Sequence, residues 1–291
     1  MPLSSCSRLL LSVLPSILVA CGARYEEFEL EEALDLPADL ATLRVHFDLG
    51  SLTVRAHADE RLVLDGRGRK NAVDDARLAR LADLDPRPSL RPTDEAGVYD
   101  YAWPELPADL DPEQAALIIR AELWLPRRVA IDVETRRGNL GVVGRDGAVR
   151  LHTGQGGLHV EDARGGVAGF TGLGQVVLHH VEGDIDVESG GGTMLCYIDR
   201  LGPGGARLKT EEPSVVCRLP VGASFRLDAK VERSHGGKVG VRNAYGIPVV
   251  SEPPGHTARG IVGDAGAPPV DIRVATGWIS IVPQDDDAEP R

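Results

Sequence analysis

The stretch TGQGGLHVEDARGGVAGF, residues 153–170, is followed directly by TGLGQVVLHHVEGDIDVE, residues 171–188. Both stretches have 18 residues, open with Thr-Gly and contain two short runs of alternating apolar and polar residues. A constant period near 20 residues is typical of repeat architectures. Three extra residues in segment 199–205 lengthen one unit. The units begin at Thr135, Thr153, Thr171, Ser189 and Thr210.

The alternating runs indicate short strands with one face inward and one outward. Leu158 and Val160 belong to the first run of a unit, and Ile185 and Val187 belong to a second run. Glycine tolerates positive φ, so a glycine before each second run suits a sharp corner between strands. These corner residues are Gly147, Gly165, Gly183 and Gly204. We therefore expect an all-β fold, a β-solenoid of roughly 18-residue coils.

The same alignment places Cys196 and Cys217 in one column of consecutive units. Stacked strands lie about 4.8 Å apart, which brings the two Cα atoms within the range of a disulfide. The alternative is a pair of packed thiols that act as small apolar residues. Neither cysteine has a histidine in its column, so we expect no metal site there.

Residues 1–20 read as a signal peptide, because a 12-residue apolar run follows the single charge of Arg8. Such a run is too short to span a bilayer as a helix. The segment Leu18-Val19-Ala20-Cys21 resembles the bacterial lipoprotein signal, which implies cleavage before an acylated Cys21 and a membrane anchor of several acyl chains. Gly22, and not Asp, follows the cysteine, which resembles the outer-membrane sorting class of lipoproteins if the host has two membranes. The alternatives are an ordinary secretory peptide or a short membrane anchor.

The segments GDIDVESGGG and LPVGASFRLDAKV, together with the Thr-Gly corners, resemble the bacterial putative-adhesin β-strand-repeat family. The likeness is strongest over residues 115–245. The resemblance implies a toastrack-like single-stranded β-helix of unknown molecular role. The sequence departs from the family pattern at Glu211-Glu212-Pro213 and at Thr276-Gly277-Trp278.

The remaining segments complete the predicted organisation. Residues 21–41 would be the acylated cysteine and an acidic tether or edge strand, and residues 42–283 one domain with regular repeats over 135–230. Within that domain, 43–54 reads as a hairpin-like pair and a first partial coil, 74–84 as an inserted helix and 85–97 as a loop. Residues 284–291 form an acidic tail. Tyr99, Tyr101 and Trp103 form either a binding surface or the cover of a core edge.

The composition limits the classes of partner. The 291-residue chain has a formal charge of −12, which disfavours nucleic acid and anionic lipid surfaces. No motif for nucleotide binding or for a serine nucleophile is present. The histidines, such as His152 and His159 on outward positions, read as solvated surface residues. Asp184 and Asp186 share a strand, but the neighbouring units lack carboxylates in their columns.

These features favour a non-enzymatic, lipid-anchored protein of the bacterial cell envelope that needs no cofactor and no metal. Its repetitive surface would bind a protein or a polysaccharide. The alternatives are an envelope-stress sensor or regulator that acts through a membrane partner and, less favoured, a glycan-active enzyme.

Overall fold

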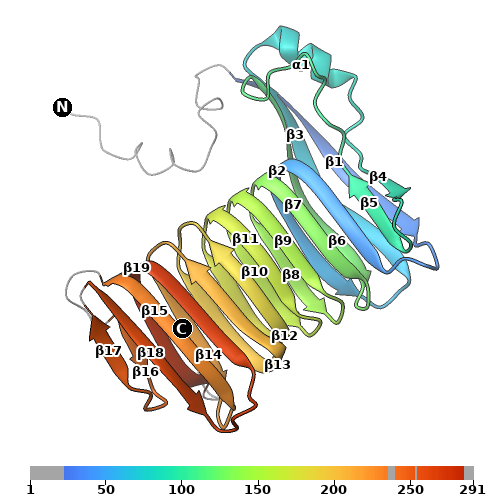
Figure 1. The fold of residues 1–291 in the computed structure, drawn as a ribbon. Helices are drawn as coiled ribbons and strands as arrows, with labels where there is room; N and C mark the ends of the chain where they lie inside the picture. Colours follow the sequence, from blue (N-terminus) through green and yellow to red (C-terminus); the bar gives the residue numbers. More distant parts are fainter. Residues whose placement is uncertain (1–22, 235–239, 253, 285–291) are drawn as a thin grey trace, which may run out of the picture.

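The computed structural model of the protein describes residues 23–234, 240–252 and 254–284. Residues 1–20, Cys21 and residues 285–291 lie outside this part of the chain, so the signal peptide and the lipid anchor stay predictions. The described residues form one α-helix and 19 β-strands, and the strands make up one large, mostly parallel sheet (Figure 1). No helix within these ranges has the length and apolar character needed to cross a membrane.

Two stacks of parallel strands make up the regular part of the sheet. Leu140 and Leu158 are register partners in the first stack, and Val149 and Val167 are partners in the second. The first stack contains β8 (Leu140–Arg145), β10 (Leu158–Ala163), β14 (Ser214–Pro220), the first halves of β12 (Val176–Ser189) and β13 (Met194–Thr210), and the second half of β19 (Pro269–Gln284). The second stack contains β7 (Ala130–Arg137), β9 (Val149–Gln155), β11 (Val167–Leu173), β15 (Phe225–Ser234) and the remaining halves of β12, β13 and β19.

Alternate residues of both stacks point into one shared core. Val160 of the first stack is fully buried, and Val187 of the second is 1% exposed. Both belong to one continuous apolar cluster. Burying Val, Ile and Leu from both sides removes apolar surface from water, which is the main stabilisation available to strands this short.

The Thr or Ser that opens each unit forms a buried column of hydroxyl groups. Thr153 and Thr171 are register partners, and both side chains are fully buried. Thr153 Oγ1 donates to the carbonyl of Gly138 at 3.0 Å, and Thr171 Oγ1 donates to the carbonyl of Gly156 at 2.8 Å. The hydroxyls thus satisfy carbonyl groups of the preceding corner, which explains why a polar residue recurs at an inward position.

The corner glycines follow the prediction only in part. Gly183 has φ of 101°, as expected, but Gly147, Gly165 and Gly204 are not among the positive-φ residues. A Cβ on Gly165 would lie 2.4 Å from the carbonyl carbon of Gly147. Glycine is therefore required there by the close approach of one unit to the next, not by a left-handed backbone.

The N-terminal part adds antiparallel strands at one end of the stacks (Figure 1). The acidic segment is an edge strand, β1 (Arg24–Asp35), which pairs with β3 (Arg61–Ala72), and β3 pairs with β6 (Ala115–Pro126). The expected helix is α1 (Asp75–Ala82). Its N-cap residue, Asp74, accepts a hydrogen bond from the Arg77 backbone N–H at 2.8 Å. Its buried residue, Leu81, belongs to a small separate apolar cluster with Ala72, Leu110 and Ala115.

Two local predictions in this part were wrong. Residues 43–54 do not form a hairpin. Instead, β2 (Thr42–His57) is one strand that continues from the second stack into the first, which agrees with the partial coil that the sequence suggested for this segment. Gly50, with φ of 130°, lies where its pairing changes. The predicted loop 85–97 contains β4 (Ser89–Pro92), which pairs with β5 (Val98–Ala102) and supplies backbone partners that β5 would otherwise lack.

The C-terminal part covers the other end with antiparallel pairs. β18 (Gly255–Val262) pairs with β15 and with β17 (Val249–Glu252), while the short β16 (Val241–Asn243) runs parallel to β19. The predicted irregularity at Thr276-Gly277-Trp278 still contains a left-handed corner, since Gly277 has φ of 150°.

Candidate functional site

The aromatic residues predicted as a binding surface belong mainly to the core. Tyr101 is fully buried, Trp103 is 5% exposed, and their rings pack edge to face at 5.6 Å. Tyr101 donates to Glu32 Oε2 at 2.6 Å, and burial raises the pKa of its phenol. Tyr99 is partly exposed and donates to Asp39 at 2.9 Å. The binding-surface alternative is therefore wrong for Tyr101 and Trp103 and the core alternative holds, because Tyr101 on β5 and Trp103 just after it are both buried.

Cys196 and Cys217 are register partners on β13 and β14, as the unit spacing predicts. Both are fully buried, and the structure holds both as free thiols. Burial raises the pKa of Cys217 to about 12 and raises that of Cys196 well above its ordinary value. At neutral pH both sulfurs are therefore protonated and act as small apolar groups in the core.

One histidine has a carboxylate partner that the spacing did not reveal. His180 has φ of 53° and lies in a register shift of β12, where two residues separate Leu178 from Val181. Its Nδ1 lies 3.0 Å from a carboxylate oxygen of Asp199. The adjacent strand has a single residue between Cys196 and Ile198, and this difference is the sequence signal for the bulge. Among the described residues, no three His, Cys, Asp or Glu side chains form a metal-binding group.

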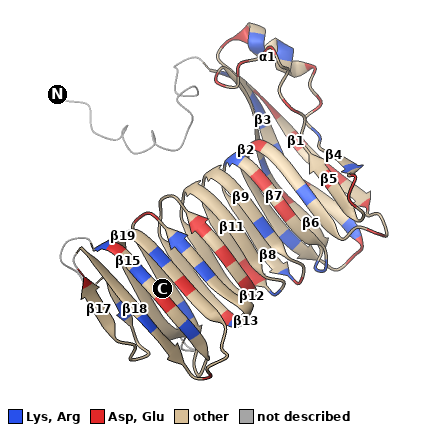
Figure 2. Cartoon of the chain, in the orientation of Figure 1, with Lys and Arg blue, Asp and Glu red and all other residues tan. Residues whose placement is uncertain are grey.

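Basic and acidic residues lie on neighbouring strands of the second stack (Figure 2), and register partners there change sign from strand to strand. Arg150 Nη1 lies 3.3 Å from Asp132 Oδ2, and Arg207 binds Asp186 through two contacts of 2.7 and 2.6 Å. We call this column the charge ladder. From β2 to β13 its register partners are Arg44, Asp132, Arg150, Ala168, Asp186 and Arg207.

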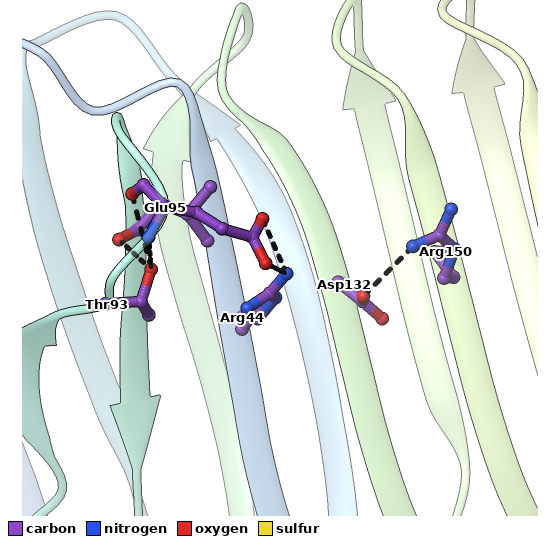
Figure 3. A network of polar contacts seen from close by, with 6 residues as sticks. Arg44, Thr93, Glu95, Asp132 and Arg150 are labelled. Atoms are coloured by element: carbon purple, nitrogen blue, oxygen red, sulfur yellow. Dashed lines mark hydrogen bonds and ion pairs between the residues drawn. The ribbon is translucent and has the colours of Figure 1, made fainter.

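One end of the charge ladder is fixed by an ion pair from outside the stack. Arg44 contacts both carboxylate oxygens of Glu95, at 2.8 and 3.0 Å, while Arg150 reaches toward Asp132 (Figure 3). The hydrogen bond with Glu95 raises the pKa of Arg44 above its ordinary value. Because the pairs tie neighbouring strands together, their side chains are held in defined positions on an otherwise flat face.

Ala168 interrupts the charge ladder. Its register partners are Arg150 on one side and Asp186 on the other. These two residues are two strand spacings apart, about 10 Å, which is too far for a direct ion pair. The Arg150 side chain is 70% exposed. The break therefore leaves a cation and an anion facing each other across an uncharged strand.

A groove of about 620 Å³ follows the charge ladder and includes this break. Asp184 lies in the groove, is exposed, and accepts a hydrogen bond from the Gly204 N–H at 2.7 Å. Asp184 forms no salt bridge with any other residue that the structure describes. The floor is built from small residues, which are Ala130, Ala148, Gly165, Gly166, Ala168, Gly204 and Gly205.

An aromatic pair lies beside the break. Phe170 is two residues from Ala168 on β11, and its ring stacks on that of His152 with centroids 4.8 Å apart and planes at 29°. His152 and Glu188 are the register partners of Phe170 on its two neighbouring strands, so an acidic residue lies on the side of Phe170 opposite to His152. His152 is exposed, as the sequence suggested, but its ring is stacked on that of the half-buried Phe170.

The groove can form charge-assisted hydrogen bonds and stacking contacts through side chains alone. Its strands are paired with neighbours on both edges, so their backbone groups are not free to take up an added strand. Asp186, which the sequence raised as a carboxylate of an unlikely enzyme, is held in the bidentate pair with Arg207. This arrangement suits recognition of a polar ligand on a rigid surface.

Comparison with known proteins adds no family assignment. No model of a known protein family matches the sequence, and no curated protein matches it. The chain is similar to the solved structure of a putative cell adhesion protein from Clostridium sporogenes, at 12% identity and a TM-score of 0.32, over 88% of this chain and 100% of that chain. It is also similar to that of a putative adhesin from Bacteroides fragilis, at 7% identity and a TM-score of 0.25, over 90% of this chain and 97% of that chain. Both TM-scores are too low to carry an argument about this chain.

Proposed function

We propose that this chain is a lipid-anchored, non-enzymatic β-solenoid protein of the bacterial cell envelope that binds a surface polysaccharide. The signal-like residues 1–20 and Cys21 support export and anchoring. Pairing at an 18-residue offset, as between Val149 and Val167, supports the solenoid. The observation that carries the binding function is the groove along the charge ladder, with its break at Ala168.

The groove favours a linear glycan over an extended peptide. Its ladder side chains repeat at the strand spacing of about 4.8 Å, which is close to the length of one pyranose unit, whereas an extended peptide repeats its side chains on one face about every 6.6 Å. Arg150 and Asp186 provide donors and acceptors for hydroxyl groups. Phe170 provides an apolar ring face that can pack against a sugar ring.

The test is binding of the full-length protein, purified in detergent, to a panel of neutral, cationic and anionic polysaccharides. Ala168→Arg should abolish binding, since a long side chain would fill the break, while the outward position leaves the core intact. An exposed substitution away from the groove, Asp65→Asn, should leave binding unchanged. Equal binding by Ala168→Arg and the parent protein would refute this groove as the glycan site.

A second candidate function is regulation through a protein partner. The outer face of the first stack carries Val177, Leu195 and Val216, which are register partners and partly exposed. Beside them the Tyr197 ring lies 5.2 Å from the Arg218 guanidinium carbon. A partly apolar, aromatic face favours protein contact over contact with a polysaccharide. In-cell crosslinking and capture of the full-length protein tests this, and one dominant membrane protein that is lost with Leu195→Glu would support it.

A further inference from the structure

The charged residues of the groove along the charge ladder indicate which chemical class of glycan it binds. We infer that it takes a linear polysaccharide bearing free amino groups, with the Asp184 carboxylate as the site of one ammonium group. This inference rests on the proposed glycan-binding function and adds the charge of the ligand to it.

The first observation is the state of the charges that line the groove. Arg150 and Arg207 are each paired with an acid of the charge ladder, and Arg44 is paired with Glu95. Asp184 differs, because it is exposed and its Oδ1 accepts only from a backbone N–H, that of Gly204. A carboxylate with remaining acceptor positions and no cationic partner is the group in the groove that gains most from a bound cation.

The second observation is the space around Asp184. The neighbouring chain is reduced to backbone, since a Cβ on Gly204 would lie 2.8 Å from the Asp184 carboxyl carbon. Gly166 and Gly205 also line the groove, so no side chain projects from these positions either. No side chain of these glycines covers the carboxylate, so its exposed side stays accessible to a ligand in the groove.

The third observation is the electrostatic balance. The charged residues that line the groove are three arginines and four carboxylates, so the groove itself carries a net charge of 3 − 4 = −1. The whole chain carries −12. Both values disfavour a polyanionic glycan and favour one with positive groups. Phe170, two residues along β11 from Ala168 and in register with Glu188, offers an uncharged surface beside the groove rather than at Asp184 itself.

The test uses the full-length protein in detergent and isothermal titration calorimetry with short glucosamine oligomers, at a mildly acidic pH that keeps their amines protonated. Fully N-acetylated oligomers of the same length are the neutral comparison. We expect the glucosamine oligomers to bind at least about tenfold more tightly. Asp184→Asn should remove this preference and leave the affinity for the acetylated oligomers unchanged.

Non-specific attraction of a cation to an acidic protein is controlled by Asp65→Asn. Asp65 is exposed on β3 and forms no salt bridge with the described residues, so this change alters the net charge by the same amount outside the groove. Equal losses in Asp184→Asn and Asp65→Asn would overturn the inference. Acetylated oligomers that bind as tightly as glucosamine, and that are lost only in Ala168→Arg, would overturn the ammonium site and keep the glycan function. A panel in which no glycan binds would overturn both.

Discussion

Cys196 and Cys217 face each other as register partners on adjacent parallel strands, and both remain free, fully buried thiols. The disulfide that their spacing permitted is absent from the structure. Their environment is that of the apolar column around them, because Leu178 precedes Cys196 in the same register. Each sulfur therefore fills core volume in place of a Val or Leu.

These thiols should be unreactive in the folded protein. Burial raises the pKa of Cys217 to about 12, so almost no thiolate is present at about pH 8, and the core also excludes the reagent. Alkylation followed by peptide mass spectrometry should leave both cysteines unmodified in native buffer and modify both in denaturant. If denatured but unreduced protein resists labelling at both positions and labels after reduction, the pair is a disulfide in solution.

Arg145 should be among the most sensitive positions for stability. Its side chain is fully buried and donates to the carbonyls of Leu125, Pro126 and Val129, at 2.9, 2.5 and 2.6 Å. Burial lowers its pKa to about 10, so it is still charged at neutral pH. Arg145→Met should lower the free energy of unfolding by about 3–5 kcal/mol, because three buried carbonyls lose their donor. Urea unfolding measures this change. A loss no larger than that of an exposed change such as Arg200→Met would contradict it.

The hydroxyl column predicts a smaller and more selective effect. Thr153→Val keeps the shape but removes the hydrogen bond to the Gly138 carbonyl, and should cost about 1–2 kcal/mol of unfolding free energy. Thr153→Ser keeps the donor and is the matched control. If the valine variant is as stable as the serine variant, the hydroxyl is not needed at this inward position.

Ile185 tests the assignment of inward and outward faces. It is 3% exposed in the column of Val149 and Val167. Ile185→Asp places an unpaired carboxylate in the core and should abolish the cooperative thermal transition. The same charge at an outward position of the adjacent strand β11, in Ala168→Asp, should leave a cooperative transition. An unchanged melting curve for Ile185→Asp would mean that the faces are exchanged.

Acid should weaken the contacts of Asp228. Hydrogen bonds from Arg273 and then from Arg259, at 2.9 and 3.1 Å, hold the pKa of this carboxyl below its ordinary value of 3.8. A depressed carboxyl pKa adds stability that is fully present above the ordinary pKa and is lost as the pH falls through the lower, folded-state pKa. The difference in melting temperature between the parent protein and Asp228→Asn should therefore shrink between about pH 5 and about pH 2. A difference that stays constant over this range would show that the pairs do not stabilise the fold.

The sequence predicted which residues share a column, because this depends only on the spacing of residues along the chain. Alternation placed Val160 and Val187 inward, and the 18-residue offset made Thr153 and Thr171 neighbours. Both follow from the two-residue period of a strand and from the stacking of equal units. The inserted helix could also be predicted from the sequence, since Asp74 is its N-cap and Leu81 is its buried apolar residue.

The candidate site was far less predictable. The sequence showed Asp184 and Asp186 on one strand. It did not show that Arg207 pairs with Asp186 and that Asp184 has no cationic partner among the described residues. For Trp103 the sequence left a binding surface and the cover of a core edge as alternatives, and only the structure, which buries the ring, decided between them. The His180 bulge depends on a one-residue difference between neighbouring strands, which an alignment by period conceals.

The sequence by itself therefore determined which residues are buried in the regular units and which share a column. Those properties depend on the conformation of a few consecutive residues repeated at a fixed distance. Only the tertiary structure decided which charges meet. Arg44 enters the charge ladder beside Asp132 because β2 pairs with β7, and Asp228 meets Arg273 because β15 pairs with β19. These contacts join segments far apart in the chain, and their register is set by packing of the whole core rather than by local sequence.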